Sequence, residues 1–383
     1  MKGKCRMTEP YKRKKAVVAG HICIDITPGI PAQASDRIQD VLMPGRLINV
    51  GEADIHTGGA VANTGLAMKL LGADVTLAGK IGDDAFGSMI LRITDEYGAS
   101  DGLIVSPGDS TSYSVVLAIP GIDRIFLHDP GANDTFCADD LPMERIREAA
   151  LFHFGYPPLM KKIYENDGAE LVKIMKSVKE AGAATSLDMA AVDPDTEAGR
   201  ADWKLILNNT LPYVDIFVPS IEELMFMLDR DKYDRIRREN PDRDLTRLMD
   251  INEDIEPLAD KCLDMGARIV LIKCGAPGLY YRTAGLREID KINGGLIPDP
   301  EKWAGKSGFE ASYRPGRVLS GTGAGDTCVA AFLASMLNGH SLSECIRYAA
   351  ATGACCVEDY DALGGIRTFD ELDKKIAAGW EKC

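Results

Sequence analysis

The sequence predicts an α/β fold in which a large, mostly parallel central sheet is flanked by helices. Strand-like and helix-like runs alternate from residue 150 onward, which is the pattern of consecutive βαβ units. Two earlier segments hold additional strand-like runs, and these predict a small second sheet. Hydrophobic residues make up 45% of the 383-residue chain, enough to build a large core. We expect this domain to extend over 15–375, after a basic tail at 1–14.

The first half of the chain begins with an apolar, β-branched run at 15–26, which predicts a buried strand. Residues 45–56 alternate weakly and predict an exposed strand or hairpin. A helix is expected at 58–72, because paired glycines open it and another glycine closes it. A strand at 74–82 and a helix at 84–98 should follow.

The extra strands of the small sheet come from about 27–56 and 105–130. Within the second segment, the runs at 111–120 and 123–129 have no helix between them. We therefore expect these two runs to pair as an antiparallel hairpin.

The second half of the chain alternates between the two kinds of run. Strands are expected at 150–155, 184–190, 214–219, 267–275 and 278–283, and helices at 159–182, 203–210, 220–228, 323–339 and 341–359. The charge-dense residues 229–256 predict a solvated helical insertion, with a binding arm as the alternative. Residues 284–315 are polar and rich in glycine and proline, so we expect a long connection or flap there.

Composition argues against several classes of partner. The formal net charge of −14 disfavours nucleic acid and anionic membrane surfaces. No run reaches the ~18 apolar residues that a membrane-spanning helix needs. The ten cysteines contain no CxxC pair and mostly occupy apolar runs, so we expect reduced, buried thiols in a cytoplasmic protein. The five histidines show no zinc-binding spacing.

A glycine-rich stretch, "GTGAGDTCVAAFLAS" at 321–335, runs directly into an apolar helix. The first turn of a helix leaves backbone N–H groups without partners and carries partial positive charge. Gly323 and Gly325 leave room beside those groups, which predicts a cradle for a phosphate or a developing negative charge. Asp326 is a poor phosphate ligand but suits a general base that deprotonates an attacking hydroxyl. The structural alternative is a glycine turn whose aspartate merely caps the helix.

This stretch resembles the second signature of the ribokinase-like (PfkB) family of carbohydrate kinases, which reads D-T-x-G-A-G-D and has its last aspartate as base. The segment "GGAVANTGLAMKLLGADVTLAGKIGDDAFG" at 58–87 is similar to the family's first signature. The motifs stand in the family's order, and the resemblance covers about 15–370. It implies a ribokinase-like fold in which the small sheet is a lid. A Walker A loop and a dinucleotide-binding fingerprint are absent from the sequence.

The resemblance implies roles for residues of this chain. The positions that hold sugar hydroxyls correspond to Asp25, Gly58, Gly59 and Asn63. The base and the backbone anion hole correspond to Asp326 and to Gly323, Ala324 and Gly325. The nucleotide-binding positions correspond to Lys273, Gly275, Gly278 and Thr322. The acid that holds Mg²⁺ through water corresponds to Glu223, in "VPSIEEL" at 218–224.

Several of these assignments have a structural alternative. Asp25 could form a turn after its strand, and Asn63 could bond locally inside its helix. Glu223 could be a solvated acid at a helix start, and Lys273 a surface lysine. Asp188, at the end of a predicted strand, either positions magnesium-bound water or caps the next turn.

Two departures from the family pattern affect the expected chemistry. Residues 320–321 read Ser-Gly where the family has D-T, so activation by a monovalent cation is doubtful. Residues 155–158 read Gly-Tyr-Pro-Pro in a region where ribose kinases have an acidic sugar contact, which argues against ribose as the default substrate. Further candidates for substrate contact, by location alone, are Arg124, His128 and His153.

The expected activity is an ATP-dependent, Mg²⁺-assisted phosphotransfer to a hydroxyl of a sugar or sugar derivative. A nucleoside kinase of the same fold is the nearest alternative. A non-catalytic regulator that binds a sugar or nucleotide on this scaffold is the alternative from another class. A homodimer through the lid is plausible, because exposed strands favour pairing. The sugar, the phosphorylated hydroxyl and the oligomeric state remain open.

Overall fold

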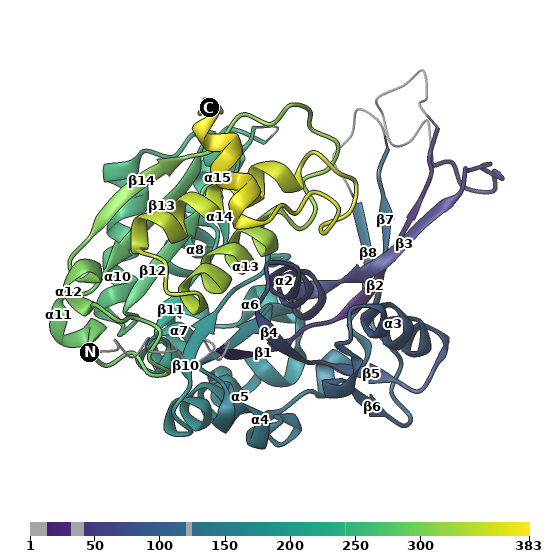
Figure 1. Cartoon of the computed structure of the whole chain (residues 1–383). Coiled ribbons are helices and arrows are strands. Elements are labelled where there is room, and N and C mark those ends of the chain that lie inside the picture. Colours follow the sequence, from purple (N-terminus) through teal and green to yellow (C-terminus); the bar gives the residue numbers. More distant parts are fainter. Residues whose placement is uncertain (1–13, 32–41, 120–124, 242) are drawn as a thin grey trace, which may run out of the picture.

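The computed structural model describes residues 14–31, 42–119, 125–241 and 243–383. Within these residues the central sheet has eight strands in the order β14-β13-β12-β11-β10-β9-β1-β4 (Figure 1). Its strands are β1 (Lys15–Gly20), β4 (Asp74–Ala78), β9 (Leu151–Gly155), β10 (Ala184–Leu187), β11 (Ile216–Phe217), β12 (Ile269–Lys273), β13 (Gly278–Thr283) and β14 (Ser307–Ala311). All neighbouring pairs from β4 to β12 are parallel, and only the pairings of β13 are antiparallel. The prediction of a mostly parallel sheet is confirmed.

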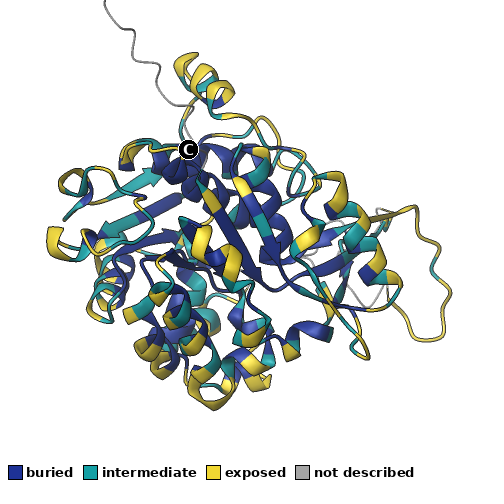
Figure 2. Cartoon of the chain, turned by 60° about the horizontal axis from the view of Figure 1, so that its bottom comes forward, coloured by how far each residue is buried: buried dark blue, intermediate teal, exposed yellow. Residues whose placement is uncertain are grey.

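Helices cover both faces of this sheet. One face carries α2 (Gly59–Leu70), α13 (Ala324–Leu337), α14 (Leu342–Cys356) and α15 (Phe369–Ala377). The other face carries α4 (Met143–Glu148), α5 (Lys161–Glu180), α7 (Trp203–Thr210), α8 (Ile221–Leu228) and α10 (Glu256–Asp264). Neighbouring residues of one strand serve opposite faces: Val18 belongs to the first core and Val17 to the second. Because both faces are covered, the central strands β1, β9, β10, β11 and β12 are almost entirely buried, and the strands in the middle of Figure 2 are dark blue.

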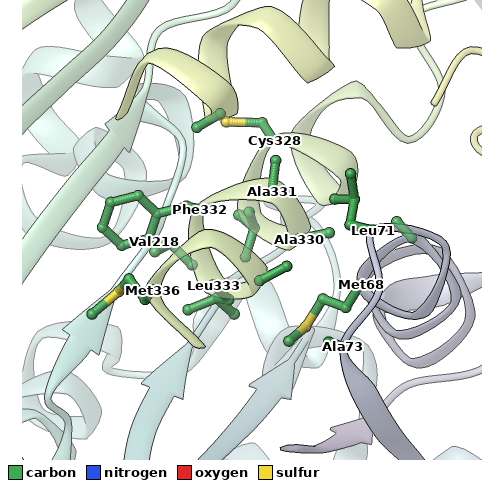
Figure 3. Packing of buried hydrophobic residues seen from close by; sticks show 14 of the residues in the cluster. Met68, Leu71, Ala73, Val218, Cys328, Ala330, Ala331, Phe332, Leu333 and Met336 are labelled. Atoms are coloured by element: carbon green, nitrogen blue, oxygen red, sulfur yellow. The ribbon is translucent and has the colours of Figure 1, made fainter. Parts of the chain in front are cut away.

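The helix α13 is almost entirely buried between α2 and α14. Its residues from Asp326 to Leu337 are all buried, and alanines at positions such as Ala330 and Ala331 let the neighbouring helices approach closely. Figure 3 shows Phe332, Leu333 and Met336 of α13 pointing into this packing, with Met68 of α2 at its side. This packing fixes the start of α13 beside α2, and both candidate motifs lie there.

A small sheet projects beside the main body (Figure 1). Its order is β3-β2-β7-β8. The strands are β2 (Cys23–Pro28), β3 (Ala53–Gly58), β7 (Tyr113–Leu117) and β8 (Ile125–Asp129). The predicted hairpin between β7 and β8 is confirmed, with antiparallel pairing from Tyr113↔Asp129 to Leu117↔Ile125. A further two-stranded sheet joins β5 (Lys80–Gly82) to β6 (Ile104–Ser106), next to α3 (Ala85–Glu96).

The prediction of a single strand at 15–26 is wrong, because the chain changes sheet after Gly20. Gly20 has φ +122°, and a Cβ there would lie 2.3 Å from the carbonyl oxygen of Gly155, so β1 ends at this close approach. The chain then enters the small sheet as β2. The strand predicted at 74–82 likewise divides into β4 and β5. Of the strand predicted at 45–56, only the last residues form a strand, as the first part of β3.

Other differences lie in the polar connections and at the chain's end. The expected connection at 284–315 contains α11 (Leu286–Ile289), α12 (Pro300–Trp303) and the sheet-edge strand β14. The charge-dense segment 229–256 holds α9 (Arg230–Glu239) and a π-helical turn (Ile251–Ile255). The helices α4, α6 (Glu197–Arg200), α10 and α15 were not expected.

Some sequence expectations fall on residues outside the described ranges. These include the basic tail up to residue 13, residues 32–41 of the first small-sheet segment, and Cys5. The nine cysteines that are described are all free, and seven of them are buried. Within the described ranges, every helix is too short or too polar to span a bilayer.

Candidate active site

The carboxylate of Asp326 lies in the first turn of α13, where α2 passes beside it. Gly323, the residue before the helix, is the N-cap of α13. Its left-handed φ of +73° turns the chain into the helix. Asn63 donates through Nδ2 to Asp326 Oδ2 at 3.1 Å, and Thr64 donates through Oγ1 to Asp326 Oδ1 at 3.3 Å. Asp326 is only 3% exposed. The structure thus brings together the two predicted motifs, at 58–87 and 321–335.

A third donor, Tyr156, reaches the same carboxylate. Its hydroxyl lies 2.7 Å from Asp326 Oδ1 and 2.8 Å from Asp326 Oδ2. Tyr156 directly follows β9 and has a left-handed backbone, with φ 67° and ψ 44°. In the sequence, Tyr156 stands out only as part of a departure from ribose kinases. The available signal was its place after a parallel strand, where side chains face the ligand crevice of α/β sheets.

Burial controls the charge of the carboxylates at this site. Removal from water raises the pKa of Asp326, while the hydrogen bonds from Tyr156 and Asn63 and the charge of Lys273 oppose that rise. Burial also raises the pKa of Asp25, against the hydrogen bond that the Cys23 thiol donates to its Oδ1 at 3.4 Å. A carboxylate whose pKa is raised is a stronger base than an exposed aspartate.

A cavity of about 620 Å³, here called the small-sheet cavity, opens between the small sheet and the main body. Asp25 and His56 line it from the small sheet, and Asn63 and Thr322 line it from the body. Its apolar and aromatic lining includes Ile93, Tyr97, Val116, Ile119 and Tyr360. The cavity therefore combines carboxylate and amide groups suited to hydroxyls with an apolar wall.

A second cavity, of about 360 Å³ and here called the turn cavity, lies on the other side of the glycine-rich stretch. The turn between β12 and β13 lines it with Lys273, Gly275 and Gly278, and α13 lines it with Ala324 and Gly325. Much of its remaining wall comes from the residues that follow β14 and from α14. The small-sheet cavity and the turn cavity share Val318 and Gly321, so they meet at the loop that leads to Asp326.

A buried ion pair stands at the carboxyl ends of the central strands. Lys273 Nζ lies 2.5 Å from Asp188 Oδ1, with the two side chains 12% and 1% exposed. Burial raises the pKa of Asp188, and the charge of Lys273 opposes that rise. Asp188 Oδ2 is buried and has no hydrogen-bond partner among the described residues. The surface-lysine alternative for Lys273 is therefore wrong, and Asp188 keeps one oxygen for a further ligand.

Some predicted site residues lie in other positions than expected. Glu223 belongs to a capping box at the start of α8, where its Oε2 accepts from the Ser220 backbone at 2.7 Å, and it lines neither cavity. Thr322, expected on the nucleotide side, lines the small-sheet cavity. Gly58 and Gly59 line neither cavity and instead pack behind the site, where a Cβ would meet Asp25, Cys23 or His21.

Three further candidates were chosen by location alone. His153 is fully buried inside the sheet, where its Nδ1 lies 2.9 Å from Ser186 Oγ, so it is a core histidine. His128 lies 3.1 Å, through Nδ1, from Ser114 Oγ, and it packs on His21 with ring centroids 5.2 Å apart. Arg124 lies outside the described residues.

Replacing Gly323 with alanine should destabilise the protein, whereas the same change at Gly325 should not. At Gly323 the backbone is left-handed and a Cβ would lie 2.2 Å from the Cβ of Ala362. We expect Gly323→Ala to lower the free energy of unfolding by about 1–3 kcal/mol. At Gly325 the nearest atom would be Lys273 Cδ at 3.5 Å, an ordinary contact, so Gly325→Ala is the matched control. Urea denaturation of both variants measures the difference, and equal stabilities would contradict this account of the turn.

Comparisons with known proteins show the family to which this chain belongs. The family model described as pfkB family carbohydrate kinase matches residues 13–368. An uncharacterized sugar kinase of Archaeoglobus fulgidus is 25% identical over 79% of this chain and 98% of its own length. Probable fructokinase-4 of Arabidopsis thaliana is 28% identical over 83% of this chain and 87% of its own length.

Solved structures show the same fold. A ribokinase of Arabidopsis thaliana complexed with ribose and ATP has a TM-score of 0.67 at 22% identity, covering 95% of this chain and 98% of that one. A fructokinase of Xylella fastidiosa with bound ATP has a TM-score of 0.70 at 19% identity, covering 96% and 99%. Because the family model spans nearly the whole chain, including both motifs that meet at Asp326, this protein belongs to the pfkB family of carbohydrate kinases.

Proposed function

We propose that this protein transfers the γ-phosphoryl group of ATP to a hydroxyl of a sugar or sugar derivative, with Asp326 as the general base. The observation that carries the proposal is the place of Asp326. Its carboxylate is buried, it is bonded to Asn63 of the small-sheet cavity, and it stands in the helix that begins where this cavity meets the turn cavity. A base for phosphoryl transfer must lie at such a junction, between acceptor and nucleotide.

The acceptor sugar occupies the small-sheet cavity in this proposal. Asp25 and Asn63 supply a carboxylate and an amide for its hydroxyls, since a buried hydroxyl without a partner is costly. The small sheet acts as a lid that excludes water from the reacting groups. Asp326 removes the proton from the hydroxyl as its oxygen attacks the γ-phosphorus.

The nucleotide occupies the turn cavity. Among the described residues, no side chain caps the start of α13. The N–H groups of its first turn can therefore stabilise negative charge on the transferring phosphoryl group. Lys273 lies next to this helix start. A Cβ placed on Gly325 would be 3.8 Å from Lys273 Nζ. The positive end of α13 and the ammonium group together favour the phosphates.

The donor set also fits Mg²⁺ held through water. Asp188 has a buried carboxylate oxygen with no partner among the described residues, and Glu223 lies close enough to raise its pKa. We assign these two acids to the metal-bound water, in line with the oxygen ligands that Mg²⁺ prefers. When bound, the ion neutralises charge on the phosphates. Potassium should change the activity little, because Ser320 stands where the family has an aspartate.

A nucleoside kinase is the second candidate, and one observation favours it. The small-sheet cavity has a wall of Tyr97, Tyr360 and aliphatic side chains that could hold a flat base. A coupled ADP-release screen over sugars, sugar acids and nucleosides separates the candidates, with competition between nucleosides and free sugars as the decisive comparison. Tight sugar binding with no turnover across the whole panel would favour a non-catalytic regulator instead.

Dimerisation through the small sheet also remains a proposal. Phe126 and Leu127 of β8 are 52% and 55% exposed, which is unusual for large apolar side chains on a strand. Exposed apolar strands favour association with a second copy of the chain.

Replacing Asp25 with alanine should raise the KM for the acceptor about 10- to 100-fold, because a hydrogen bond to a charged group is lost. The effect on kcat should be smaller. Steady-state kinetics with the acceptor found in the screen measure both constants. Asp74→Ala is the matched control, since it removes an exposed carboxylate on β4 that lines neither cavity. An unchanged KM in Asp25→Ala would place the sugar site elsewhere.

A further inference from the structure

Three side chains donate hydrogen bonds to the Asp326 carboxylate and together cover both of its oxygens. Oδ1 accepts from Thr64 and Tyr156, and Oδ2 accepts from Asn63 and Tyr156. A carboxylate offers about four lone pairs. Three protons do not fill all four, but the Tyr156 oxygen lies against both carboxylate oxygens, so an acceptor hydroxyl meets Tyr156 in the space between them.

Of the three donors, Tyr156 is the one that can leave. Asn63 and Thr64 belong to α2, and the packing of α2 along α13 holds them in place. Tyr156 stands in a turn and has a left-handed backbone, which is costly for a residue other than glycine. Its single hydroxyl proton is shared between two oxygens, at 2.7 and 2.8 Å. A single proton shared between two oxygens binds Tyr156 less strongly than a separate hydrogen bond to each oxygen would.

A partner for the released hydroxyl lies next to Tyr156. The ring of His21 is 6.0 Å from the Tyr156 ring, centroid to centroid. His21 is buried, and neither ring nitrogen has a hydrogen-bond partner among the described residues. Burial lowers the pKa of His21 to about 3, so the ring is neutral and one nitrogen is an acceptor.

We propose that the Tyr156 hydroxyl occupies the position of the acceptor hydroxyl in the unliganded enzyme, and that a bound sugar displaces it. This inference rests on the proposed role of Asp326 as base. Tyr156 then acts as a positioning residue that keeps water away from Asp326 while the sugar site is empty. A sugar can displace it because its other hydroxyls are held by the cavity, whereas a water molecule has no such additional contacts.

Loss of the hydroxyl should allow water to take the place of the sugar. The water oxygen would attack the γ-phosphorus, Asp326 would take its proton, and the bond between the γ-phosphorus and the leaving oxygen of ADP would break. The products are ADP and inorganic phosphate. The enzyme would then consume ATP without a sugar, a reaction that the intact Tyr156 suppresses.

The test measures phosphate release from MgATP without any sugar in wild type, Tyr156→Phe and Tyr156→Leu. We expect both variants to hydrolyse ATP about tenfold faster than wild type or more, the value of one lost hydrogen bond to a charged group. The double variant Tyr156→Phe/Asp326→Asn should return to background. Tyr164→Phe is the matched control, because it removes a phenol hydroxyl on α5 near Trp203, away from Asp326.

The kinetics with the acceptor sugar provide the second readout. Tyr156→Phe should lower KM for the sugar or leave it unchanged, with kcat within about twofold, because nothing has to be displaced. A fall in kcat of tenfold or more at unchanged KM would overturn the proposal, since Tyr156 would then stay on Asp326 during turnover. Hydrolysis at the wild-type rate in folded Tyr156→Phe and Tyr156→Leu would overturn it as well. Asp326→Asn in the otherwise wild-type protein tests the base by itself, so failures of the two ideas are distinguishable.

Discussion

Replacing Asp326 with asparagine should lower kcat by a factor of about 10²–10⁴, because the amide cannot take the proton of the acceptor hydroxyl. The fold should tolerate the change, since the amide keeps an oxygen that can accept from Asn63, Thr64 or Tyr156. Binding of sugar and of MgATP, measured by calorimetry, should remain within a few-fold of wild type. A kcat within a few-fold of wild type would remove Asp326 from the role of base.

The pH dependence of the wild type provides the control for this prediction. Burial raises the pKa of Asp326, and the base works only when it is ionised. Activity should therefore be fully present above the raised pKa and be lost as the pH falls through it. This acidic limb of the pH–rate profile should lie above the ordinary aspartate pKa of about 3.9. In the residual activity of Asp326→Asn this limb should change, because only Asp25 and Asp188 remain as buried site acids with a raised pKa.

Replacing Lys273 with methionine should destabilise the fold and weaken nucleotide binding together. The change leaves the buried Asp188 carboxylate without its partner at 2.5 Å. Breaking a buried ion pair by removing one partner costs about 3–5 kcal/mol in the free energy of unfolding. Because Lys273 also lines the turn cavity, the KM for MgATP should rise. Urea denaturation and steady-state kinetics measure the two effects separately.

A double variant distinguishes the structural role of Lys273 from its functional role. Lys273→Met/Asp188→Asn removes both charges, so no buried charge is left unpaired and most of the lost stability should return. The KM for MgATP should nevertheless remain raised, because the positive group beside the start of α13 is still missing and Asp188 no longer holds the metal-bound water. A return of both stability and KM to wild-type values would show that Lys273 serves the fold alone.

The sequence was sufficient to predict the main sheet, the hairpin of β7 and β8, and the two motifs that meet at Asp326. Those features depend on local patterns: apolar runs, turn residues and glycines at a helix start. The strand β14 was missed because its run "SGFEA" is short, polar and at the sheet edge. The break between β1 and β2 was missed because it depends on Gly155, which is far along the chain.

Tyr156 shows why part of the site could not be predicted. Its hydroxyl meets a carboxylate 170 positions later in the chain, and this contact depends on the backbone turn after β9. No periodicity or spacing encodes such a contact. Glu223 illustrates the opposite case, because one local pattern, a serine followed by a glutamate three residues later, fits both a metal ligand and the observed capping box.

The central claim is that the junction at Asp326 joins a phosphoryl group to a sugar hydroxyl, and product analysis tests it most directly. The protein and its Asp326→Asn variant are incubated with MgATP and each acceptor of the panel, and ADP and acceptor are quantified by coupled assay and mass spectrometry. The account predicts ADP and a phosphorylated sugar in equal amounts from the wild type, and almost none of either from the variant. Equal yields from both proteins, or a sugar that binds tightly but is never phosphorylated, would contradict it.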